Sequence, residues 1–163
     1  MKKIIFSVIT IIMLVCASCA TTTTAAKPTG AAAEFAAFNA VIEKSFNNIS
    51  SRLKAGMRIA ILPIRAADQK NGDYAFDTIE TMFSNALMYD MITRTKIAEL
   101  IQEQKFQYSG LVDDNTAVQF GKLLGAQAII VGDIAGADYT RRLVFRCLDV
   151  QTGRILAISS ETF

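Results

Sequence analysis

The chain begins with a short apolar run behind two lysines. Lys2 and Lys3 precede a mostly apolar stretch at residues 4–15, and small residues follow it up to Cys19. A basic start, about a dozen apolar residues and small residues at a cut site are typical of a secretory signal peptide. The run is shorter than the roughly 20 residues that a membrane-spanning helix needs. We therefore predict that residues 1–18 are a signal peptide.

A helical pattern of apolar side chains starts at residue 34, after a stretch that lacks one. Residues 19–33 are mainly Ala and Thr, with Lys, Pro and Gly, and this composition predicts a lipidated N-terminus followed by a flexible tether. From residue 34, large apolar residues recur at steps of three and four, which predicts an amphipathic helix that packs on a core. They are Phe35, Phe38, Ile42, Phe46, Ile49 and Leu53. We expect residues 34–163 to form a single domain.

Apolar runs without helical spacing predict strands. The first runs over residues 57–64 and is nearly all apolar, which favours a strand covered on both faces. Pro63 should end this strand or place it at an edge, because proline cannot donate to a sheet. Shorter strands are expected at 91–93 and 128–131. Near the C terminus, residues 142–150 and 155–163 flank a loop that contains glycine, and this pattern predicts a β-hairpin.

Three further helical stripes lie between the strands. Their apolar positions fall within residues 76–87, 97–101 and 120–124. Thr95 is expected to cap the second of these helices, and Thr116 to open the third through a capping box with Gln119. The polar segment 65–73 is predicted to be a loop, with turn chemistry at residues 71–73. Helices that alternate with strands before a final hairpin predict an α/β fold, in which helices pack on a mixed β-sheet.

The net charge and the residue types present limit the classes of function that the sequence supports. The chain has 17 basic and 15 acidic residues, and loss of Lys2 and Lys3 with the signal peptide leaves 15 of each. A neutral protein gives no electrostatic support for nucleic-acid binding. Histidine is absent, so the commonest general base and metal ligand are missing, and we expect no enzyme, metal or cofactor. Cys147 is the only cysteine beyond the N-terminal region, and we expect it to be buried and unpaired.

Cys19 has the surroundings of a lipidated cysteine. Ala17-Ser18-Cys19 is similar to a bacterial lipobox, in which a dedicated peptidase cuts before a cysteine that receives lipid such as palmitate; Cys16 stands where leucine is usual. The alternative is an ordinary secreted protein that is cut near Ser18 and keeps Cys19 as a free thiol. The residue after the cysteine is Ala20 and not aspartate, which favours the outer membrane over retention at the inner membrane.

Carboxylate pairs are the remaining candidates for catalysis. Glu99 and Glu103 are one helical turn apart, and such pairs can do acid–base work. Two other pairs could offer oxygen ligands, namely Asp73 with Asp77 and Asp113 with Asp114. Solvated helix faces, charges at helix N termini and caps explain all of them more simply. We therefore assign no catalytic and no metal-binding residue.

Arginines on the predicted hairpin give a candidate contact surface. Arg142 and Arg146 fall on one face of the same predicted strand, and Arg154 lies in the loop that follows it. One interpretation is a surface for a protein partner or an anionic glycan. The other is a set of solvated charges that discourage pairing at a strand edge.

Ordered motifs from Met57 to the end resemble the curli-assembly lipoprotein family typified by CsgG. They are Ile-Leu-Pro-Ile at 61–64, Ile-Thr-Arg at 92–94, Ile-Gln-Glu-Gln at 101–104, Tyr-Ser-Gly-Leu at 108–111, Gly-Lys-Leu-Leu-Gly-Ala at 121–126, Ile-Val-Gly-Asp-Ile at 130–134 and Asp-Val-Gln-Thr-Gly at 149–153. The same region is similar to LpoB, an activator of penicillin-binding proteins, and to the amino-terminal domain of TolB, which share that fold. The resemblance implies a structural ion pair between Arg94 and Glu103.

The resemblance also implies a role in the cell envelope. Pore-forming members of the family insert two long β-hairpins into the outer membrane, which takes about 40 residues. Segments 65–73 and 135–140 are too short for such inserts, so we expect a compact form without them. LpoB-like members reach through the cell wall on a tether longer than this one.

The function that we expect from the sequence is therefore binding and not catalysis. The protein should be a non-enzymatic, lipid-anchored lipoprotein of the outer membrane, with its domain in the periplasm or exposed at the surface. It should bind another envelope protein or itself, with no nucleic acid and no evident small-molecule substrate. The alternatives are a subunit or accessory of a curli-like secretion complex, an activator of a cell-wall synthase, and a hydrolase that uses carboxylates without histidine.

Overall fold

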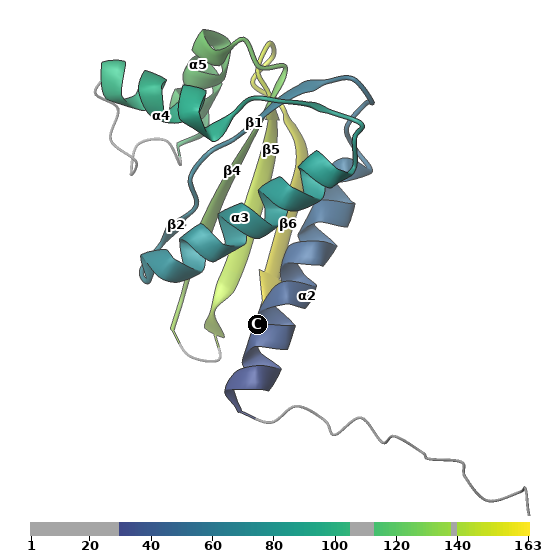
Figure 1. The fold of residues 1–163 in the computed structure, drawn as a ribbon, viewed down its shortest axis with the longest axis vertical. Helices are drawn as coiled ribbons and strands as arrows, with labels where there is room; N and C mark the ends of the chain where they lie inside the picture. Colours follow the sequence, from purple (N-terminus) through teal and green to yellow (C-terminus); the bar gives the residue numbers. More distant parts are fainter. Residues whose placement is uncertain (1–29, 105–112, 138–139) are drawn as a thin grey trace, which may run out of the picture.

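The computed structural model describes residues 30–104, 113–137 and 140–163. Cys19, the predicted signal peptide and residues 19–29 of the predicted tether lie outside the described residues. Within the described ranges, no helix is long and apolar enough to cross a membrane. This part of the chain is a mixed sheet with helices on both faces (Figure 1). The architecture confirms the expected α/β fold.

The sheet combines parallel and antiparallel pairing. Its strands are β1 (Arg58–Ile61), β2 (Arg65–Ala66), β3 (Asp90–Met91), β4 (Ala128–Ala135), β5 (Arg142–Asp149) and β6 (Ile155–Thr162). They follow the order β3-β1-β4-β5-β6, and β2 continues beside β4 beyond the end of β1. The first part is parallel, whereas β4, β5 and β6 are antiparallel. Pro63 lies in the gap between β1 and β2, where no strand hydrogen bond is needed from it.

In the described part of the chain, four helices cover the two faces of the sheet. They are α2 (Ala31–Ser50), α3 (Gln69–Asn85), α4 (Arg94–Glu103) and α5 (Asp114–Leu124). Successive side chains of a strand point to opposite faces, and those of β1 divide accordingly. Ile59 and Ile61 join the α2–α3 core, which includes Phe38, Ile42, Ile49, Ile79, Phe83 and Phe145. Ala60 joins the α4–α5 core, which includes Leu62, Ile97, Ile101, Phe120, Ile129 and Leu148.

The segment predicted as a loop at 65–73 is instead a short strand and the start of a helix. Asp68 caps α3 by accepting a hydrogen bond from the backbone nitrogen of Lys70 at 3.1 Å. Gly72 lies within the helix and is buried, and a Cβ added there would come within 2.6 Å of the Ile64 carbonyl oxygen. The prediction was wrong because Gly72 permits close packing of α3 on the chain after β1 and does not form a turn.

Two helix caps lie earlier in the chain than predicted. The N-cap of α4 is Thr93 and not Thr95, and its side chain accepts from the Lys96 backbone nitrogen at 3.4 Å. The N-cap of α5 is Asp113, whose Oδ1 accepts from the Thr116 backbone nitrogen at 3.0 Å. The predicted capping box that begins at Thr116 is therefore wrong. In both helices the accepting residue lies just before the first turn. From there its side chain can reach the backbone N–H groups of that turn, which have no partner within the helix.

Cys147 is buried in the α2–α3 core, as the sequence indicates. Burial, and to a smaller degree the charge of Asp149, raise the pKa of the Cys147 thiol to about 12. A thiol with such a pKa is neutral at physiological pH and unreactive. Cys147 therefore acts as a small apolar side chain.

Candidate functional site

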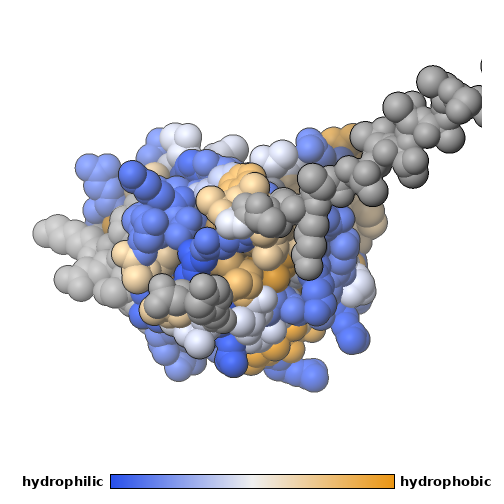
Figure 2. Space-filling view, turned by 90° about the horizontal axis from the view of Figure 1, so that it is seen from below, coloured by the Kyte–Doolittle hydropathy of each residue, from blue (hydrophilic) through white to orange (hydrophobic). Residues whose placement is uncertain are grey.

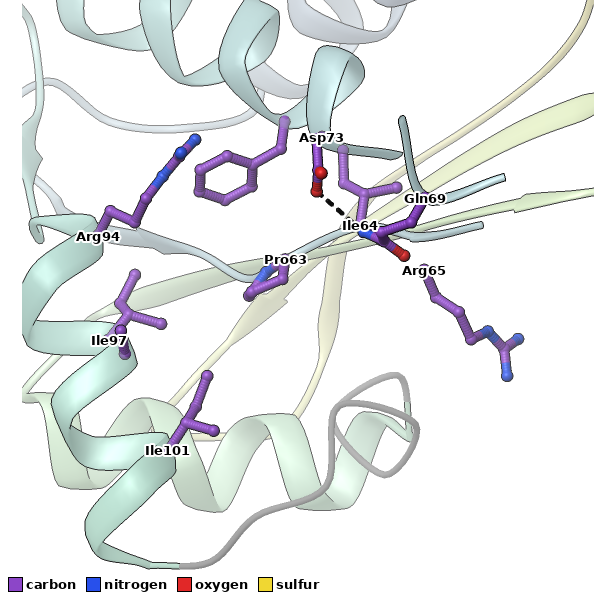
Figure 3. Close-up of a pocket in the computed structure, with 10 residues that line it drawn as sticks. Pro63, Ile64, Arg65, Gln69, Asp73, Arg94, Ile97 and Ile101 are labelled. Atoms are coloured by element: carbon purple, nitrogen blue, oxygen red, sulfur yellow. Dashed lines mark hydrogen bonds between the residues drawn. The ribbon is translucent and has the colours of Figure 1, made fainter. Parts of the chain in front are cut away.

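A cavity lies at the sheet edge between α3 and α4 (Figure 3). Strand β3 has only two residues and pairs with the first half of β1. The chain at residues 62–65 is therefore free of a neighbouring strand on that side, and the two helices face each other across it. The cavity has a volume of about 520 Å³. Its lining consists of Pro63, Ile64, Arg65, Gln69, Asp73, Phe76, Arg94, Ile97, Ala98 and Ile101.

The polar groups of this α3–α4 cavity are mostly engaged with one another. Gln69 Nε2 donates to Asp73 Oδ1 at 3.0 Å and to the Ile64 carbonyl oxygen at 3.2 Å. The Arg94 guanidinium lies over the Phe76 ring, 4.2 Å from its centroid. Arg65 points away from the cavity (Figure 3), and its Nη2 lies 4.0 Å from Asp133 Oδ2. The surface that remains for a ligand is mainly apolar.

This lining suits binding better than catalysis. The lining residues, among those that the structure describes, include no serine, cysteine, lysine or tyrosine that could act as a nucleophile or a base, and the carboxylate among them, Asp73, accepts a hydrogen bond from Gln69. A concave, mostly apolar surface with a few fixed polar groups is the usual form of a site for apolar side chains or small apolar ligands. Elsewhere, the residues that the structure describes contain no cluster of three potential metal ligands.

The carboxylate pairs singled out in the sequence have structural positions. Glu99 and Glu103 are both exposed on α4. Asp113 caps α5, while Asp114 accepts a hydrogen bond from Arg146 Nε at 2.9 Å. Asp77 on α3 pairs with Arg94. Glu99 and Glu103 thus lie on a solvated face and Asp113 is a cap, whereas Asp77 and Asp114 belong to ion pairs.

Arg94 and Glu103 are not brought together. They are the first and last residues of α4, which separates their backbones by about 13 Å along the helix axis. Arg94 instead pairs with Asp77 and, at 3.5 Å, with Glu80 on α3. The ion pair therefore joins α4 to α3 beside the cavity, and not the two ends of one helix.

The three arginines of the hairpin do not form one surface. Arg142 lies opposite Thr162 at one end of the hairpin, whereas Arg154 precedes β6 at the other, about 26 Å away at the usual rise per strand residue. The Arg146 side chain is only 22% exposed and lies between Asp114 and Asp133. Arg142 and Arg154 are exposed, so each can belong to a contact surface, but not to the same compact patch.

A second hollow lies at the lower end of the domain, where α2 begins. Seen from below, apolar side chains come to the surface near the middle of this end, between hydrophilic ones (Figure 2). The hollow measures about 960 Å³ and includes Ala33, Ile134 and Phe163 in its lining. Glu34 pairs with Arg141, whose guanidinium lies 5.0 Å from the Phe163 ring centroid. This hollow is larger but more polar than the α3–α4 cavity.

Most of the cavity residues were not recognised from the sequence. Gln69 and Asp73 fell in the predicted loop, although Asp68 followed by the apolar spacing of Ala75, Phe76 and Ile79 could have placed the helix start earlier. The cavity combines three separate segments of the chain, around residues 64, 72 and 97. No local sequence pattern predicts that these three segments come together.

Comparison with known proteins finds one family model and several solved structures that are similar to this domain. Residues 66–143 match the family model of the curli production assembly/transport component CsgG. The C-terminal domain of LpoB from Salmonella enterica is 16% identical, with a TM-score of 0.61, over 75% of this chain and 97% of that one. The same domain from Escherichia coli is 15% identical, with a TM-score of 0.59, over 78% and 96%. A comparison with curated proteins finds no match.

A third solved structure agrees with these two. Lipoprotein GNA1162 from Neisseria meningitidis is 13% identical, with a TM-score of 0.54, and the match covers 66% of this chain and 79% of that one. At such identities the structural likeness establishes the fold alone. The matched stretch 66–143 runs from the end of β2 into β5 and includes both helices of the α3–α4 cavity. Residues 66–143 are therefore similar to the CsgG family, and the domain has the fold of the LpoB C-terminal domain.

Proposed function

We propose that this protein is a lipid-anchored lipoprotein of the outer membrane whose periplasmic domain is a non-enzymatic, protein-binding module. The observation that carries the proposal is the α3–α4 cavity, whose described lining is mainly apolar and includes no serine, cysteine, lysine or tyrosine. The family match supports a role in the envelope, because the model that residues 66–143 match is that of an assembly and transport component. The lipobox-like Ala17-Ser18-Cys19 supports the anchor.

In this proposal the cavity receives apolar side chains of the partner. Ile97 and Ile101 form one wall and Phe76 the other, and Arg94 lies across the Phe76 ring. Interfaces gain most of their affinity from a few apolar or aromatic anchors that fill a pocket. Ala98 is exposed and lies at the rim of the cavity. A larger side chain at this position would fill the cavity without removing a core contact, so a substitution here can test the proposal.

The test of the cavity compares Ala98→Trp with Gln102→Trp. Gln102 is exposed on the same helix but does not line the cavity. Both variants, and the unchanged protein, are crosslinked in intact cells and purified, and the partners are quantified by mass spectrometry. We expect Ala98→Trp to lose at least four-fifths of the partner and Gln102→Trp to keep it. Equal recovery from both variants would refute binding through this cavity.

The test of the anchor is Cys19→Ala. One acyl chain alone gives only marginal membrane binding, and the several chains of a lipidated cysteine give stable anchoring. We expect the variant to accumulate as an uncleaved precursor or as soluble protein, measured by fractionation and by the mass of the N terminus. Normal mature protein in the membrane fraction would exclude lipidation at Cys19.

Two finer roles have separate support. The CsgG family match favours a subunit or accessory of a curli-like secretion complex, and the fold of LpoB favours an activator of a cell-wall synthase. Light scattering of the lipid-free protein separates them, since a ring-sized oligomer supports the first role. A monomer that stimulates a purified synthase supports the second.

A further inference from the structure

We infer that the distal end of the domain is a second docking surface, and that its partner is an acidic protein surface with an apolar pocket. By distal end we mean the turn after α2 (residues 51–57), the α3–β3 turn (86–89), the C terminus of α5 (122–127) and the β5–β6 turn (150–155). These segments lie beyond the upper end of α2 in Figure 1, whereas the helix begins at the lower end. The inference deepens the proposed function by giving the partner's chemistry, and it uses the proposed anchor for its orientation.

Exposed apolar side chains gather at this end. Among the residues that the structure describes, the large apolar ones with at least half of their surface exposed are Phe35, Leu87, Met88, Leu123, Ile155 and Ile158. Four of these, Leu87, Met88, Leu123 and Ile155, lie in the segments of the distal end. Single exposed apolar residues need no explanation, but a group of them that is rimmed by polar residues marks an interaction site.

Leu87 is the most prominent member of the group. It is 90% exposed and has a φ of 51°, a left-handed conformation that disfavours side chains larger than glycine or asparagine. Its neighbours hold the turn in place, because the Met88 carbonyl accepts from the Gly56 backbone nitrogen at 2.7 Å. The Tyr89 hydroxyl also donates to the Ser50 carbonyl at 3.2 Å, and its ring packs edge-on against Phe83. Neither burial nor backbone preference accounts for leucine at this position.

The charges around this apolar group are mainly positive. The exposed cationic side chains are Arg52, Lys54, Arg58, Lys122 and Arg154, against the carboxylates of Asp90 and Asp149. Asp90 is occupied by Arg58 at 2.7 Å, and Asp149 accepts from Thr152. Arg52, Lys54 and Lys122 have no carboxylate partner within the described part of the chain. A partner with excess negative charge complements this surface, whereas a second copy that presents the same end is repelled.

The position of the distal end favours a protein over the anchoring membrane. Helix α2 has 20 residues and is about 30 Å long, so Cys19 joins the domain at the opposite end. Residues 20–30 can span at most about 38 Å when fully extended. To rest the distal end on the same membrane, the tether would have to run almost fully extended along the whole of α2. The distal end therefore faces away from the anchor, toward a protein.

The experiment places a photo-crosslinking amino acid at Met88 in the full chain, in living cells, and identifies the adduct by mass spectrometry. Three backgrounds are compared, namely the unchanged chain, Lys54→Glu with Lys122→Glu, and Lys70→Glu with Lys96→Glu. The last pair makes the same change in charge at exposed positions away from the distal end. A further background, Leu87→Asn, removes the apolar side chain and suits the left-handed backbone. Thermal unfolding monitors the fold of each variant.

We expect an adduct to a protein segment with an excess of Asp and Glu. Its yield should fall at least fivefold in the Lys54→Glu, Lys122→Glu background and in Leu87→Asn, and should hold in the Lys70→Glu, Lys96→Glu control. The absence of an adduct, or one to lipid, to a second copy of this chain or to a segment without excess acidic residues, would overturn the inference. So would a yield that is indifferent to the charge reversal. If this experiment fails while Ala98→Trp still reduces partner recovery, the docking role of the distal end is refuted and the proposed function is retained.

Discussion

The two sides of the sheet differ in how completely they are closed. The α2–α3 core contains Phe83, Ile79 and Ile42 with no measurable exposure, and two long helices cover it. The α4–α5 core is covered by shorter helices, and its residues Ile97 and Ile101 line the α3–α4 cavity together with Ile64 and Phe76 from the edge of the α2–α3 core. Under the proposed function, the interior of the α2–α3 core stabilises the fold, and the α4 side of the cavity offers a surface for binding.

The largest effect should come from truncation in the closed core. Ile79→Ala removes a side chain that is completely buried between α3 and the sheet. We expect a loss of about 4 kcal/mol in the free energy of unfolding, because a closed core cannot collapse around the new void. Urea denaturation monitored by circular dichroism measures the change. A loss below about 2 kcal/mol would show that this side is not rigidly packed.

The same truncation beside the cavity should have a smaller effect. Ile97→Ala is a matched change on α4, also in a buried position. We expect a loss of about 2 kcal/mol, at the low end for such substitutions, because Ile97 already borders open space and forfeits fewer contacts. Both losses of unfolding free energy are measured in the same denaturation series. A larger loss in Ile79→Ala than in Ile97→Ala would show that the α2–α3 side is packed more tightly. Equal losses would contradict it.

A smaller change tests the hairpin that connects β5 and β6. Asp149 Oδ1 accepts from the Thr152 backbone nitrogen at 2.7 Å and from its hydroxyl at 2.8 Å. These hydrogen bonds are the main reason that the pKa of Asp149 lies below its ordinary value. We expect Asp149→Ala to lose about 1 kcal/mol at neutral pH.

The same residue makes a prediction about pH. A carboxylate with a lowered folded pKa stabilises the fold fully above its unfolded pKa of about 3.9, and this contribution disappears as the pH falls through the folded value. The difference in unfolding free energy between the unchanged protein and Asp149→Asn should therefore shrink below about pH 4. Denaturation series at pH 7 and pH 3 measure it. A difference that is constant with pH would mean that the charge of Asp149 does not contribute.

The sequence predicts the closed side of the molecule better than the open side. The stripe that includes Phe38, Ile42 and Ile49 identifies α2, and the apolar strands and the hairpin are found where expected. These features arise from local periodicity. The start of α3 was missed because Gly72 is typical of a turn, and its packing against Ile64 depends on tertiary structure.

The candidate site could not be predicted for a similar reason. The α3–α4 cavity exists because β3 is short and leaves the sheet edge open, and a strand length is poorly determined by sequence alone. Arg94 was singled out, but its partners Asp77 and Glu80 lie on another helix. The conformation of Leu87 likewise depends on contacts with distant residues such as Ser50 and Gly56.

The central claim, that the open side binds a protein and does not stabilise the fold, is tested most directly by Ala98→Trp. The measurement pairs the free energy of unfolding with the amount of partner recovered after crosslinking in intact cells, using Gln102→Trp as the control. We predict that Ala98→Trp changes the stability by less than about 0.5 kcal/mol, as at other exposed positions, while it abolishes most of the partner recovery. Unchanged recovery, or a loss of recovery that merely follows a loss of stability, would contradict the claim.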